Sequence, residues 1–170
     1  MEIIKQKFDT KKMVVLTSLI ITSVILSVLN ISFLGIKLHS FQLVIFFVAM
    51  CYGPLLAGVA GGISSIYSSI ITGNPYIILF NILLGYSFGK FYKTNPISAL
   101  IKSVLVVYPL ITFFDFYVVR MAPKLILTLI ISLSITNILW VIVAKKLKIW
   151  LNDDFKNLVE IIYKTYGRKL

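Results

Sequence analysis

Side chains suited to catalysis or metal binding are few in this chain. Its 170 residues include one histidine, one cysteine and six acidic residues. No phosphate-binding glycine loop, G-x-G-x-x-G dinucleotide motif or H-E-x-x-H zinc motif occurs. A zinc site needs more ligands than His39 and Cys51 supply. We therefore expect no catalytic residues, no metal, no cofactor and no enzymatic activity.

Asp115 is the only acidic residue between Asp9 and Asp153, and it lies in an apolar stretch. An ionisable residue in such a stretch is a functional hypothesis by default, with a structural pair to Arg120 or Lys124 as the alternative. Other polar residues interrupt the apolar runs near the same end of the predicted helices. Because polar groups in an apolar environment are costly unless they face one another or water, we expect one outward-opening cavity. The predicted substrate-binding residues are Asn30, Lys37, His39, Gln42, Asn74, Tyr76, Asn81, Asp115, Tyr117 and Arg120.

The composition identifies the elements that must position these residues. Hydrophobic residues make up 59% of the chain and charged residues 14%, whereas soluble domains contain about 45–50% and about 25% respectively. The mean hydropathy is +0.97. The net charge of +11 is concentrated at the ends and in short connections, which is a topology pattern rather than a nucleic-acid surface. We expect a multi-pass protein of the cell membrane that contacts lipid and no nucleic acid.

Six apolar runs separated by turn residues predict an all-α membrane protein, a compact bundle of six transmembrane helices. Their expected ranges are 13–34, 38–52, 54–71, 76–91, 97–119 and 125–144. Lysines cluster before the first run, after the fourth and after the sixth, so the positive-inside rule places both termini in the cytoplasm. Residues 1–148 form the predicted transmembrane domain. Apolar residues recur at helical spacing in 149–170, which predicts a separate amphipathic helix on the cytoplasmic membrane surface, either an anchor or a docking helix for a partner.

Small residues form ridges on the third and fourth predicted helices. Ala57, Gly61, Ser65 and Ser69 recur every four residues, and Gly85 and Gly89 make a G-x-x-x-G pair beside Asn81. In lipid, helices associate through such close backbone contacts. The ridges therefore predict packing within the bundle, with partner binding as the alternative.

Residues 41–62, FQLVIFFVAMCYGPLLAGVAGG, combine a short apolar helix, Gly-Pro and spaced small residues. This pattern resembles the substrate-binding S components of energy-coupling factor transporters. The resemblance implies capture of a vitamin or similar micronutrient from outside, association with a transmembrane coupling protein and two cytoplasmic ATPases, and reorientation in the membrane. It also implies a lid formed by residues 35–39. The partner-binding face would be Ser18, Thr22, Ser23 and Ser27, a hydroxyl-rich counterpart of the family's alanine-rich face.

The aromatic residues Tyr76, Tyr108, Phe113, Phe114 and Tyr117 either form a belt at the membrane interface or wall a pocket for a flat ring. In the second case, the aromatic and amide residues suit a small planar heterocycle, such as a vitamin or a nucleobase-like compound. Two other classes stay open on sequence grounds. A rod-shape-determining membrane scaffold has a similar size and helix count and would use the small-residue ridges for partners. A membrane sensor module also carries Gly-Pro followed by spaced glycines, normally fused to a catalytic domain.

Overall fold

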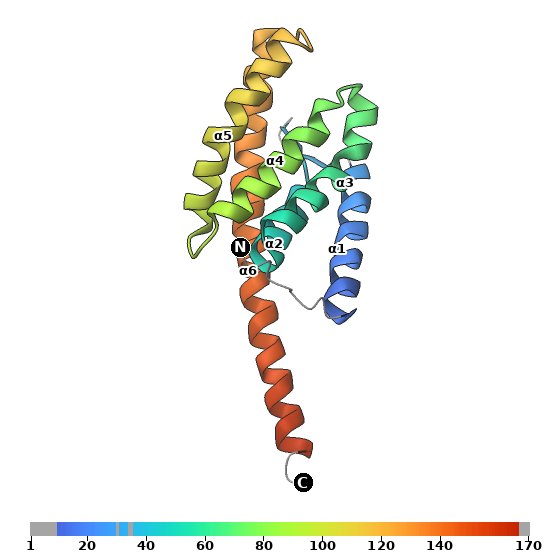
Figure 1. The fold of residues 1–170 in the computed structure, drawn as a ribbon, viewed down its shortest axis with the longest axis vertical. Coiled ribbons are helices and arrows are strands. Elements are labelled where there is room, and N and C mark those ends of the chain that lie inside the picture. Colours follow the sequence, from blue (N-terminus) through green and yellow to red (C-terminus); the bar gives the residue numbers. More distant parts are fainter. Residues whose placement is uncertain (1–9, 30, 34–35, 167–170) are drawn as a thin grey trace, which may run out of the picture.

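The computed structural model describes the backbone of residues 10–29, 31–33 and 36–166, and the side chains of residues 13–29 and 39–151. This part of the chain forms six helices and one short β-hairpin (Figure 1). In order they are α1 Thr10–Val28, β1 Ile31–Phe33, β2 Ile36–Leu38, α2 Gln42–Tyr52, α3 Pro54–Thr72, α4 Tyr76–Phe91, α5 Pro96–Tyr117 and α6 Pro123–Tyr166.

Within the described residues, three helices are long and apolar enough to cross a membrane: α3, α5 and residues Pro123–Leu151 of α6. The apolar part of α1 (Met13–Val28), α2 and α4 are shorter. Large apolar side chains also face outward, including Leu55 at 73% exposed, Ile70 at 71% and Leu105 at 69%. Exposed apolar surface on this scale is stable in lipid and not in water. The helices therefore indicate a membrane protein.

The most buried helix is α2, which packs against α1, α3, α4 and α6. Phe46 on α2 is fully buried, and its ring centre lies 4.8 Å from that of Phe88 on α4. Eleven helical residues span about 16 Å, roughly half the hydrocarbon thickness of a bilayer. Since lipid satisfies no backbone groups, so short a helix is stable at membrane depth only when protein surrounds it.

At the break between α2 and α3, a side chain from α6 donates a hydrogen bond to a backbone carbonyl that has no helical donor. Pro54 has no amide hydrogen, so the carbonyl of Met50, four residues earlier, lacks its helical donor. The Lys148 ammonium donates a hydrogen bond to this carbonyl at 2.7 Å, and it lies 4.9 Å from the ring centre of Tyr92. Lys148 thus ties α2, α4 and α6 together at one end of the bundle.

Small residues join α3 and α4, the most extensive helix pair in the described chain. Gly61 lies against the main chain of Asn81, and Gly85 lies against the main chain of Ala57, so closely that a Cβ atom at either glycine would collide with backbone. Close contact of this kind drives helix association where the hydrophobic effect is absent. The small-residue ridges therefore pack inside the bundle.

Two predicted boundaries are wrong. The helix expected over 13–34 ends at Val28, and the chain then forms the antiparallel β1–β2 hairpin, with Ser32 opposite Lys37. The helix expected from residue 38 begins at Gln42. Ile31 and Ile36 are β-branched residues that favour strands, and hydrophobic periodicity does not separate a short apolar strand from a helix.

The expected break after residue 144 is also absent, because α6 continues to Tyr166 and its last part extends beyond the other helices (Figure 1). The sequence contains no proline or glycine between Pro123 and Tyr166 that would end the helix. The predicted boundary between residues 1–148 and 149–170 therefore lies within one helix. The location of its end on the membrane surface stays a prediction.

Candidate functional site

A cavity of about 300 Å³ lies at one end of the bundle, at the lower end of the size range of small-molecule sites. Its lining comes from the segment before α2, the starts of α2 and α4, the ends of α3 and α5, and the first half of α6. Successive helices run in opposite directions, so these parts meet at the same end. The hairpin leads directly into this lining at His39.

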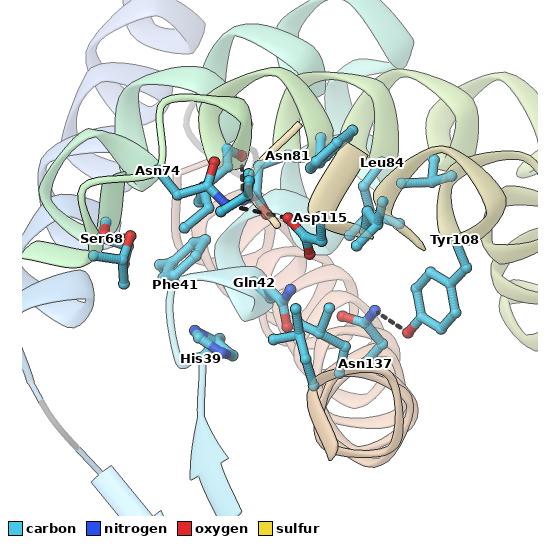
Figure 2. A pocket seen from close by; sticks show the side chains of 18 of the residues that line it. His39, Phe41, Gln42, Ser68, Asn74, Asn81, Leu84, Tyr108, Asp115 and Asn137 are labelled. Atoms are coloured by element: carbon cyan, nitrogen blue, oxygen red, sulfur yellow. Dashed lines mark hydrogen bonds between the residues drawn. The ribbon is translucent and has the colours of Figure 1, made fainter. Parts of the chain in front are cut away.

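Half of the ten predicted substrate-binding residues line this cavity: His39, Gln42, Asn74, Asn81 and Asp115. Figure 2 shows Gln42, Asn81 and Asp115 directed toward the same hollow from α2, α4 and α5. These residues are separated by up to 76 positions in sequence, from 39 to 115. The structure thus brings together polar groups that lipid would not tolerate separately.

Asp115 is held by the loop that begins α4. The Asn74 side-chain amide donates to a carboxylate oxygen of Asp115 at 3.2 Å, and Asp115 is only 2% exposed. The Asn74 side-chain oxygen in turn accepts a hydrogen bond from the Tyr76 backbone amide at 3.1 Å. This Asx-type turn fixes Asn74, and it fixes Asp115 through Asn74. The contact joins α4 to the end of α5 (Figure 2).

Arg120 and Lys124 do not pair with Asp115. Both are exposed, and neither lines the cavity. Arg120 instead adopts a left-handed backbone conformation, with φ at 57°, where the chain turns from α5 toward α6. The structural pair that the sequence left open is therefore not formed.

Three further predicted substrate-binding residues lie outside the cavity. The Tyr76 ring packs against Phe114, with 5.0 Å between ring centres. Tyr117 is 65% exposed and packs against Phe113. The structure therefore does not bring these tyrosines or Arg120 to the cavity. Asn30 and the side chain of Lys37 lie outside the described residues, so their assignment stays a prediction.

Asn137 is the main lining residue that the sequence analysis missed. It lies in α6, is 1% exposed, and donates from its amide to the Tyr108 hydroxyl at 3.2 Å (Figure 2). The signal was present, because Asn137 is the only amide residue in the apolar run 125–144. Ser68, Thr72 and Tyr108 also line the cavity without having been selected.

Two polar atoms at this cavity have no partner among the described residues. They are the side-chain oxygens of Gln42 and Asn137, and both are buried. An unpaired buried acceptor is costly, and such atoms are ordinarily satisfied by water or by a ligand. The Gln42 and Asn137 amides that line the cavity therefore each retain an acceptor that no described residue satisfies.

The predicted partner-binding ridge of α1 divides into two faces. Ser18 and Thr22 are exposed, and each donates to a carbonyl of its own helix. Ser23 is buried and hydrogen-bonds to Ser64 on α3, and Ser27 is also buried. Ser23 therefore joins α1 to α3, and the burial of Ser23 and Ser27 leaves Ser18 and Thr22 on the exposed face of α1.

Among the residues that the structure describes, no three His, Cys, Asp or Glu side chains lie together as a metal site would require. Comparison with models of protein families, with curated proteins and with solved structures found no match.

Proposed function

We propose that this chain is a multi-pass membrane subunit that captures a small organic solute from outside the cell, in the manner of the S components of energy-coupling factor transporters. The observation that carries the proposal is the cavity, where Gln42, Asn81, Asp115 and Asn137 converge from four helices. Polar lining in an otherwise apolar bundle is the arrangement expected of a solute site.

The charges support an outward-facing cavity. Lys90 at the end of α4, Lys102 near the start of α5 and Lys148 in α6 belong to the end of the bundle opposite the cavity. The positive-inside rule assigns that end to the cytoplasm. With six crossings and both termini inside, the cavity opens to the exterior.

The position of the glycines favours solute capture over a membrane scaffold. A scaffold would offer the small-residue ridges to partners, whereas Gly61 and Gly85 are buried between α3 and α4. The free surface of α1, which carries Ser18 and Thr22, remains for a membrane coupling protein.

The proposal predicts that a coupling protein and two ATPases co-purify with the chain from its own membrane in mild detergent. Thr22→Trp should weaken this association because it places a bulky ring on the exposed face of α1. Ile138→Trp is the matched control, since Ile138 is also exposed but lies on α6, which does not contact α1. Recovery of the chain without ATPases would show that the proposal is wrong.

A further inference from the structure

The described residues that line the cavity include one acidic side chain, Asp115, and one histidine, His39, but no lysine or arginine. One oxygen of Asp115 accepts the hydrogen bond from Asn74. No described residue donates to the other oxygen or forms an ion pair with the carboxylate. A buried ionised carboxylate without a partner cation is unfavourable, so an occupant that carries a positive charge would stabilise the ionised form of Asp115.

The neighbouring amides extend the hydrogen-bonding surface around this carboxylate. Gln42 and Asn137 are 2% and 1% exposed, and each has an unpaired side-chain oxygen. Figure 2 shows both side chains in the same hollow as Asp115. An amide can turn either its oxygen or its nitrogen toward a ligand, whereas an ionised carboxylate only accepts. The charge preference of the cavity therefore rests on Asp115, and the amides add positions for N–H groups.

Apolar side chains form much of the remaining wall, beside polar residues such as Ser68, Thr72 and Tyr108. Phe41 and Phe80 contribute aromatic rings, and Leu84, Val107 and Ile111 contribute aliphatic surface. Such walls suit a flat apolar body. The lining therefore combines an apolar enclosure with a local acceptor group.

We propose that the cavity selects a small organic cation whose positive head group carries N–H donors, such as an amidine or an aminated heterocycle, and that it excludes anions of the same shape. This inference rests on the proposed role in solute capture and specifies the chemical class of the solute. The charge-assisted hydrogen bonds from the head group to Asp115 are the interaction that sets the selectivity.

Three probes of nearly equal shape test the inference on the purified full chain in detergent: benzamidine, benzamide and benzoate, which are cationic, neutral and anionic. Binding is measured by ligand-observed NMR titration at pH 8, where an ordinary imidazole is neutral. We expect benzamidine to bind at least about tenfold more tightly than benzoate, a difference of about 1.4 kcal/mol. Equal binding, tighter binding of benzoate or no binding by benzamidine would overturn the inference.

Asp115→Asn provides the second readout, because it removes the charge and retains a similar shape. We expect this variant to bind benzamidine and benzamide equally. Asp153→Asn is the control, since it removes the same charge from the distal part of α6. Retained benzamidine preference in Asp115→Asn would also overturn the inference. Co-purification with the ATPases is measured separately. A chain that co-purifies with ATPases but prefers benzoate would contradict this inference alone. A chain that prefers benzamidine but is recovered without ATPases would contradict the proposed function.

Discussion

Gly61→Ala is expected to destabilise the bundle by about 1–3 kcal/mol, the cost of inserting a methyl group where the packing has no room. The added Cβ would collide with the main-chain carbonyl of Asn81. Backbone cannot rotate away as a flexible side chain can, so α3 and α4 must separate. Because Asn81 lines the cavity, the same change should weaken ligand binding. Unfolding in mixed detergent micelles, followed by tryptophan fluorescence, measures the effect.

Gly58→Ala is the matched control, with the same chemical change one turn earlier in α3. Its Cβ would lie 3.4 Å from the Ile82 carbonyl oxygen, which is close to ordinary van der Waals contact. We expect little destabilisation, since alanine is also the better helix former. Equal losses of stability in the two variants would contradict the close-packed α3–α4 interface.

Lys148→Met is expected to cost about 1–3 kcal/mol, because it leaves the Met50 carbonyl without a donor. The variant also loses the contact of the ammonium with the Tyr92 ring, worth about 0.5–2 kcal/mol. Lys148→Arg should retain part of the stability, since guanidinium can donate to the same carbonyl. The same unfolding assay applies.

Lys146→Met provides the control for loss of a lysine charge, because Lys146 is exposed on the same helix and makes no described hydrogen bond. We expect its stability to match that of the unsubstituted chain. If Lys146→Met were as destabilising as Lys148→Met, net charge rather than the bond to Met50 would account for the effect.

The helices could be predicted from sequence because apolar runs and breaker residues mark them directly. Gly53-Pro54 separates α2 from α3, and Asn95-Pro96 precedes α5, where the Asn95 side chain accepts from the Ile97 amide at 3.0 Å. The β-hairpin could not be predicted, because its two strands are only three residues each and are as apolar as the helices beside them. The length of α6 was missed because a change in composition near residue 144 does not break helical backbone.

The candidate site could be predicted in part, since depth along each helix follows from topology. That argument identified Asp115, Asn74 and Gln42, which line the cavity. It could not give the rotation of each helix, and rotation decides which side chains face inward. Tyr117 is thus exposed while Asp115, two residues earlier, is buried. Asn137 could have been selected as the only amide residue in the apolar run 125–144, but its contact with Tyr108 is visible only in the folded structure.

Native mass spectrometry of the purified chain tests most directly whether the cavity holds a solute. The account predicts a small organic compound bound in equal stoichiometry to the protein, and its loss from Leu133→Trp, in which a larger side chain fills the cavity. Leu139→Trp is the control, because Leu139 is exposed on the same helix and lies outside the cavity lining. A chain that carries no compound, or that retains it equally in Leu133→Trp, would contradict solute capture at this site.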